Sequence, residues 1–277
     1  MSEENKIRDA ADAIKGIVEA VPVYQDVVQP AAREVGTALQ TVAKTLHILL
    51  APVSGLVWGY DKIRDFVGEK VAQKLSEVPA EELRSPEPHV AGPALEALRY
   101  TGYQQSLRDM YANLLATSID TKTAQQAHPA FVEIIRQMSP DEALIVRALA
   151  ALGAAPTIDI RAEKKASNVG RWRLRHFSLL PYEAQCASPD LGSNYLVNLA
   201  RLGVIEIREN YRLQADDETD VYTPLLDFPE VRLLKEQLDA SSDLKPSIAR
   251  GAVMFTQLGN QFCSACVFDD THIRKNG

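Results

Sequence analysis

Apolar residues between positions 35 and 75 recur at intervals of three and four, which is the spacing of one face of an α-helix. Pro52 divides them into two stripes, because proline disfavours helix at the residue before it, and Ser54 is a good N-cap for a second helix. Residues 1–85 are therefore expected to form an N-terminal region of amphipathic helices, as a hairpin, a bundle or one kinked rod. The stripes are Val35, Leu39, Val42, Leu46 and Leu49, then Leu56, Tyr60, Ile63, Val67, Val71 and Leu75.

A second helical pattern follows a stretch rich in proline. Residues 77–93 hold four prolines and predict a linker. From Ala94 to Met138 the apolar residues again have helical spacing, with a break predicted at Thr101-Gly102. We expect residues 86–138 to form a central helical region.

The pattern changes after residue 138. Ser139-Pro140 followed by two acids predicts the start of a helix, and Gly153 predicts its end. The segments that follow predict, in order, a strand, a helix stopped by Gly203, further strands, another helix, and a strand that leads into a last helix capped at Thr256. Their sequences are TIDIRAE, SPDLGSNYLVNLARLGVIEI, ENYRLQADDETDVY, PEVRLLKEQLD and GAVMFTQLGNQFCSACV.

This order of elements is typical of a winged helix-turn-helix, with the helix before Gly203 as the candidate recognition helix. The 35 residues before that helix are too many for a simple turn. We therefore expect a mainly α protein, in which an N-terminal helical hairpin or bundle is followed by a winged-helix-like α+β part over residues 139–277.

The longest uncharged stretch of the chain is residues 45–60, in the segment TLHILLAPVSGLVWGYD, which ends at Asp61. A membrane-spanning helix needs about 20 apolar residues, and this segment is shorter and is interrupted by Pro52, Gly55 and Gly59. A buried corner between two helices is the leading interpretation, and a membrane segment released on activation is the alternative, since Trp58 and Tyr60 suit an interface. The candidate membrane or partner contacts are Leu49, Leu50, Leu56, Val57, Trp58 and Tyr60.

Charge gives one candidate surface for nucleic acid or acidic lipid. The net charge of −7 provides no global attraction to either, so any such contact must be local. A basic run between residues 161 and 176 surrounds an aromatic residue that could stack on a base. A solvated loop explains the same run, and acids in the predicted wing disfavour DNA. The basic run consists of Arg161, Lys164, Lys165, Arg171, Arg173, Arg175 and His176, and Trp172 is the aromatic residue inside it.

No arrangement of residues in the sequence predicts an enzyme, a cofactor, a metal site or a small-molecule substrate. Cys263 and Cys266 have the spacing of a metal half-site, but with only one other cysteine in the chain we expect them to pack in a core. Asp159 and Glu163 are similar to the carboxylates of metal-dependent nucleases but stand too close in sequence. Few cysteines and an acidic, non-signal N-terminus favour a cytoplasmic protein, peripheral to the inner membrane on activation.

Three segments carry a family resemblance: VGTALQTVAKTLHILLAPVSGLVWGYDKIRDFVGEKVAQKL, HVAGPALEALRYTGYQQSLRDMYANLLATSID and AHPAFVEIIRQMSPDEALIV. Together they resemble the Abi-alpha family of bacterial proteins, which is associated with abortive infection, over about residues 35–267. The resemblance implies phage defence and supplies no catalytic residues. We expect a non-enzymatic sensor or effector that acts by conditional membrane contact, or through a protein partner or self-association. The alternative is a winged-helix DNA-binding regulator that uses residues 161–176.

Overall fold

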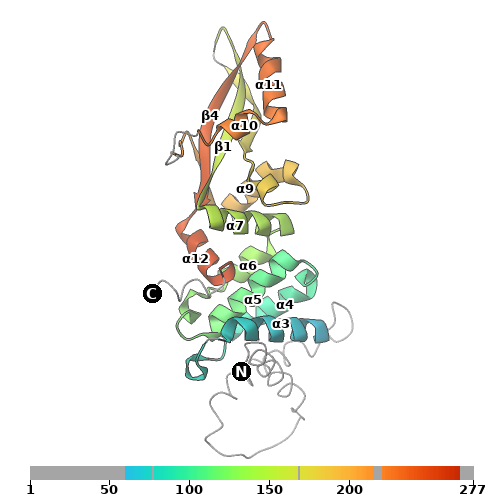
Figure 1. The fold of residues 1–277 in the computed structure, drawn as a ribbon, viewed down its shortest axis with the longest axis vertical. Coiled ribbons are helices and arrows are strands. Elements are labelled where there is room, and N and C mark those ends of the chain that lie inside the picture. Colours follow the sequence, from blue (N-terminus) through green and yellow to red (C-terminus); the bar gives the residue numbers. More distant parts are fainter. Residues whose placement is uncertain (1–59, 77, 168, 215–219, 269–277) are drawn as a thin grey trace, which may run out of the picture. The chain divides into compact units, whose positions relative to one another are not determined.

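The computed structural model of the chain describes residues 60–76, 78–167, 169–214 and 220–268 (Figure 1). The chain divides into two compact units. One consists of Met1–Pro140 with Gln261–Gly277, and the other is Asp141–Asn260. The second unit is therefore inserted in the sequence of the first.

The described part of the first unit is helical and is built around α5. Every residue of α5 from Met110 to Ile119 is buried, so this helix is covered on all sides. Residues Gln261–Gly277 contribute to the same core, since Phe262 of α12 meets Phe131 of α6 edge to face, with ring centroids 5.4 Å apart. The helices are α3 (Tyr60–Leu75), α4 (Pro88–Thr101), α5 (Gln105–Ile119) and α6 (Ala130–Arg136), with 3-10 turns η2 (Ala80–Glu82) and η3 (Ala124–Gln126).

The second unit contains a four-stranded antiparallel sheet with the strand order β2-β1-β4-β3. Its strands are β1 (Ala154–Lys164), β2 (Gly170–Phe177), β3 (Ile205–Glu209) and β4 (Leu244–Phe255). Its helices are α7 (Pro140–Leu152), α8 (Leu180–Glu183), α9 (Gly192–Arg201), α10 (Thr223–Leu226) and α11 (Pro229–Asp239), with the 3-10 turn η4 (Pro189–Leu191). Helix α12 (Gln257–Cys266) begins in the second unit and ends in the first.

Apolar and charged residues alternate along β1, so the sheet has a core face and a charged face. Ile158, Ile160 and Ala162 share a buried cluster with Leu225 of α10 and Val231 of α11, so these two helices cover the core face (Figure 1). Successive side chains of a strand point to opposite faces. The intervening residues of β1, which include Asp159 and Arg161, are therefore turned to the other face.

Two irregularities in the pairing of β1 with β2 shape that charged face. Ile158 is paired with Phe177, Ile160 with Leu174, and Arg161 with Trp172. Strand β2 therefore has an extra residue at Arg173, and a second one where both Arg175 and His176 face Asp159. Extra residues of this kind form β-bulges, which bend a strand and redirect its side chains.

The expectation of a mainly α protein is wrong. The described chain is α+β, because the second unit contains this sheet. Strand β2, GRWRLRHF, is rich in arginine, and the first half of β4, LKPSIAR, contains a proline and two cations. Neither segment has the apolar alternation that predicts a half-buried strand. The α+β character expected of the C-terminal part is confirmed, since helices and the four-stranded sheet alternate along it.

Several local predictions are confirmed. Helix α7 begins at Pro140 and ends before Gly153, which has a positive φ of 79°, and α9 is followed by Gly203 with a φ of 74°. Positive φ favours glycine, so both residues stop their helices as expected. Thr256 caps α12, because its Oγ1 accepts a hydrogen bond from the Gly259 N–H at 2.9 Å.

Two local predictions are wrong. The last six residues of the expected linker, 88–93, form the start of α4, which includes Pro93. In the segment ENYRLQADDETDVY, no second strand follows β3 among the described residues, and the partner of β3 is instead β4. The region between them contains α10 and α11, so the wing is replaced by a longer helical connection.

Candidate functional site

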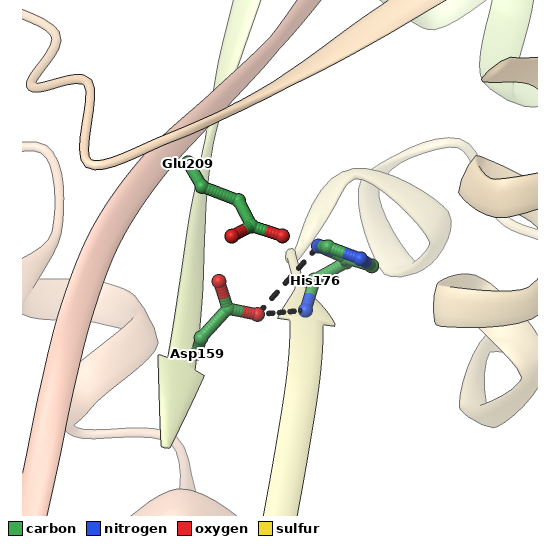
Figure 2. A group of neighbouring side chains, drawn as sticks. All are labelled: Asp159, His176 and Glu209. Atoms are coloured by element: carbon green, nitrogen blue, oxygen red, sulfur yellow. Dashed lines mark hydrogen bonds and ion pairs between the residues drawn. The ribbon is translucent and has the colours of Figure 1, made fainter. Parts of the chain in front are cut away.

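Three ionisable side chains converge on the charged face of the sheet. Asp159 of β1, His176 of β2 and Glu209 at the end of β3 each offer one ligand atom, and these atoms all lie within 4.8 Å of one another. Figure 2 shows the two carboxylates and the imidazole turned toward one point. We call these three residues the carboxylate–histidine cluster.

Asp159 is fixed by the bulge in β2. Its side chain is 4% exposed, and its Oδ1 accepts a hydrogen bond from the His176 backbone N–H at 2.6 Å. His176 has a φ of 53°, a left-handed conformation that costs energy for a residue with a side chain. The bulge thus brings both the N–H and the ring of His176 to the buried carboxylate (Figure 2).

The Nδ1 atom of His176 is 3.6 Å from Asp159 Oδ1, beyond a normal hydrogen bond. Among the described residues this buried nitrogen has no hydrogen-bond partner. A buried polar atom without a partner costs free energy. The cluster therefore contains one buried nitrogen whose capacity for a hydrogen bond or a ligand bond is unused.

Arg175 supplies a fixed positive charge beside the cluster. Its Nη2 pairs with Glu209 Oε1, and its Nε lies 4.0 Å from Asp159 Oδ1. Its guanidinium carbon also lies 5.0 Å from the centre of the Trp172 ring, a cation–π distance. Two carboxylates of the cluster thus share one guanidinium.

The donor set of the cluster suits a divalent transition metal. Imidazole nitrogen and carboxylate oxygen are both ligands of Zn²⁺, and carboxylates also suit Mn²⁺. The arrangement offers one nitrogen and at least two oxygens from three separate strands. The sequence did not predict this set. The three residues come together only through the bulged pairing of β2 with β1 and through the position of β4 between β1 and β3. The one signal was an aspartate inside the apolar alternation of TIDI.

The structure also locates the basic run. Lys164, Lys165, Arg171 and Arg173 are exposed, Trp172 is 46% exposed, and Arg161 and Arg175 are half-buried. Arg171 to Arg175 belong to β2, an edge strand paired only with β1, so the expectation of a solvated loop is wrong for them. Arg161 is paired with Trp172 across the strands, with its guanidinium carbon 5.8 Å from the ring centre.

Among the described residues, neither the predicted membrane contacts nor the nuclease-like pair as a whole belongs to the carboxylate–histidine cluster. Leu49, Leu50, Leu56, Val57 and Trp58 lie outside the described residues, and Tyr60 is the first residue of α3. Glu163 lies 3.7 Å from Arg161 and is not part of the carboxylate–histidine cluster, so the structure does not bring the nuclease-like pair with Asp159 together.

Cys263 and Cys266 have the surroundings of cysteines that pack in a core and do not react. Cys263 and Cys266 are both buried in the core of the first unit, which confirms the packing prediction. Burial raises the pKa of the Cys263 thiol to about 12 and that of Cys266 well above its usual value, where Cys263 adds repulsion. Both thiols are therefore protonated at neutral pH and are poor nucleophiles.

Helix α9 presents little to a nucleic acid. Its exposed residues are Asn194, Val197 and Arg201. Arg201 donates to the Asn198 side chain through Nε at 2.9 Å and Nη2 at 2.8 Å, and Asn198 donates to Glu142 at 2.7 Å. The single cation of the expected recognition helix is thus held by its neighbour.

No helix in the described ranges combines the length and the apolar character that crossing a bilayer requires.

Comparison with known proteins gives one family and one structure. The model of a family described as Abortive infection alpha matches residues 59–266, most of the chain. No curated protein matches the chain. A solved structure of an uncharacterised protein from the hydrocarbon-degrading marine bacterium Alcanivorax borkumensis SK2 is similar over 52% of this chain and 96% of its own. The two share 19% sequence identity, and the TM-score is 0.35.

Proposed function

Since this chain belongs to the abortive infection alpha family, we propose that it acts in phage defence as a non-enzymatic sensor whose second unit binds nucleic acid. The contact surface in this proposal is the edge strand β2 and the adjoining end of β1. The observation that carries it is the gathering of exposed cations beside an exposed tryptophan on one strand.

Three of these cations are available to an anionic ligand. Among the described residues, no carboxylate oxygen lies within 4.0 Å of the charged groups of Lys164, Arg171 or Arg173. Arg171 is paired with Ala162 and Trp172 with Arg161, so these neighbours on β2 point to opposite faces. Cations on both faces of a strand edge can reach phosphates on two sides, while an exposed indole can stack on a base.

The surface differs from that of a typical winged helix. In helix-turn-helix proteins the recognition helix enters the major groove. Here Arg201 is the only lysine or arginine of α9 and is bound by Asn198. The charges that could bind phosphate lie on β2, so the proposal assigns contact to the strand and not to the helix.

A protective role for the arginines is the competing explanation. Charged side chains on an edge strand prevent pairing with strands of other molecules. Under that explanation, removal of two cations promotes aggregation and leaves affinity for nucleic acid at the level of a control. Under our proposal, affinity itself falls.

The experiment compares two double variants of the full chain. Arg171→Gln/Arg173→Gln removes two cations from β2, and Arg232→Gln/Lys235→Gln removes two cations from α11 of the same unit. Fluorescence anisotropy with labelled single-stranded RNA, single-stranded DNA and duplex DNA is measured over a range of salt concentrations. If two phosphate contacts are lost, the slope of log affinity against log salt decreases in magnitude by about 1.4 to 1.8 for the β2 variant.

The control variant should keep the slope of the unmodified chain. Equal binding by both variants, or no binding by the unmodified chain at low salt, overturns the nucleic-acid proposal. Expression in a phage-challenged host then tests the role in defence: the unmodified chain and the α11 variant reduce plaque formation, and the β2 variant does not.

The other two routes predicted from the sequence have separate tests. Conditional membrane contact by residues 45–60 is tested by dye release from liposomes, with Leu49→Lys/Leu56→Lys as the variant. Release by the unmodified chain and its loss in the variant would favour that route over β2. Self-association or a protein partner is tested by light scattering and by capture from infected cells.

A further inference from the structure

We propose that Asp159, His176 and Glu209 form a binding site for one divalent transition-metal ion, with Zn²⁺ and Mn²⁺ as the ions that best match the donors. This site is independent of the proposed nucleic-acid contact, since a metal could bind there whether or not β2 meets a phosphate. Its role in the chain would be to join the two outer strands of the sheet.

The geometry is close to that of a three-ligand site. Ligand atoms bound to one tetrahedral ion at about 2.1 Å lie about 3.4 Å from one another. The three atoms here are already within 4.8 Å of one another, and two of the side chains are largely buried. Small side-chain rotations suffice to bring the three ligand atoms to the spacing of a bound ion. The three backbones are already fixed by the pairing of β1, β2 and β3 with their neighbouring strands.

The unpartnered nitrogen is the observation that points to a ligand. His176 Nδ1 is buried, lacks a hydrogen-bond partner among the described residues, and is directed toward Asp159 (Figure 2). An ion at this point would satisfy that nitrogen. It would also place positive charge between two carboxylates that share the guanidinium of Arg175.

Arg175 is the competitor of the ion. Its guanidinium pairs with Glu209 Oε1, which must be released before that oxygen can bind a metal. The guanidinium also lies against Trp172, so it keeps one contact when it leaves the carboxylate. Removal of this cation should therefore strengthen metal binding, whereas removal of a ligand should weaken it.

A network of ion pairs without a metal is the alternative. In that case Arg175 would be a stabilising partner of the two carboxylates. This alternative makes the opposite prediction for Arg175, since its loss would then reduce stability and create no metal affinity.

The test uses the full chain without a histidine tag, after dialysis against chelator. Zn²⁺ binding is measured by calorimetry and Co²⁺ binding by its visible absorption. The ligand variants are Glu209→Gln and His176→Asn, because asparagine tolerates the left-handed backbone of position 176. The matched control is Glu206→Gln, which removes the same charge from the same strand. Arg175→Gln removes the competitor.

We expect the unmodified chain and Glu206→Gln to bind one equivalent of metal. The affinity should fall at least about tenfold in Glu209→Gln and in His176→Asn, and rise in Arg175→Gln. Absence of binding in both the unmodified chain and Arg175→Gln overturns the proposal. So does binding that is equal in Glu209→Gln and Glu206→Gln, because the ion would then be held elsewhere.

Discussion

The side chain of Asn113 in α5 donates a hydrogen bond through Nδ2 to the backbone carbonyl of Cys266, 2.8 Å away and 153 positions later in the chain. Thr117, one turn further along α5, donates to the carbonyl of Ala265 at 3.0 Å. The last carbonyls of a helix lack partners within it. Two polar side chains of α5 thus satisfy the end of α12 inside the core of the first unit.

Asn113→Ala should lower the free energy of unfolding by about 1 to 3 kcal/mol, because it leaves a buried carbonyl without its donor. Urea denaturation followed by circular dichroism measures the loss. Asn194→Ala, at an exposed position of α9, is the control and should change the value by less than about 0.5 kcal/mol. Equal stability of the two variants would mean that the Asn113 bond contributes nothing net.

The three thiols should be unreactive in the folded chain. All three cysteines are buried, and burial raises the pKa of Cys186 to about 11, with a contribution from the Asp141 charge. At about pH 8 such a thiol has roughly two orders of magnitude less thiolate than an exposed cysteine. Ellman's reagent should therefore react slowly with the native chain and at once after denaturation in guanidinium chloride. Fast reaction of one thiol in the native chain would show that its site opens.

Asp141 should make stability depend on acid pH. Burial alone would raise the pKa of its carboxyl, but the backbone N–H groups of Ala187 and Ser188 and the hydroxyl of Tyr195 donate to it. These bonds place the pKa below the usual 3.8. A lowered pKa in the folded state stabilises the chain above the unfolded pKa, and that stabilisation is lost as pH falls through the folded value.

Asp141→Asn should therefore cost about 1 to 3 kcal/mol at neutral pH, and the gap to the unmodified chain should narrow between about pH 5 and pH 2. Urea denaturation at several pH values gives both curves. Asp227→Asn, at an exposed position after α10, is the control. A gap that stays constant across the acid range would contradict the assignment.

Gly259 allows a close approach between α12 and the segment after α9. A Cβ at this position would overlap the carbonyl oxygen of Val204, and that oxygen also accepts a hydrogen bond from the Thr256 N–H at 3.1 Å. Gly259→Ala should destabilise the chain by about 1 to 3 kcal/mol, despite the better helix propensity of alanine. Thermal unfolding measures the loss, and Gln261→Ala, exposed on the same helix, is the control. A stabilised Gly259→Ala chain would refute the overlap.

Helices and their ends could be predicted from the sequence because their signals are local. Helices α7, α9 and α11 follow from periodicity and from the caps or stops at Pro140, Gly153 and Gly203. The partners of the strands could not be predicted in this way. Strand β3 pairs with β4 across the helical connection, and no local pattern identifies a partner that distant.

The candidate site shows the same limit. The sequence shows the concentration of basic residues in the basic run. It does not predict that they lie on an edge strand, because arginines interrupt the apolar alternation of β2. The carboxylate–histidine cluster depends on an extra residue opposite Asp159. A shift of one residue in register moves a side chain to the other face of a sheet, so the cluster exists only at the register that the bulge sets.

The second unit is inserted in the sequence of the first, and this has a consequence for synthesis on the ribosome. Helix α5 emerges long before residues 261–266, and the whole of Asp141–Asn260 is translated in between. At typical rates of translation this interval lasts on the order of ten seconds. During that time Asn113 and Thr117 have no carbonyls to bind and the core beside Phe131 lacks Phe262. The first unit to be made is thus the last to be completed, and a nascent chain of this protein passes through a long interval in which an apolar surface is open to chaperones and proteases.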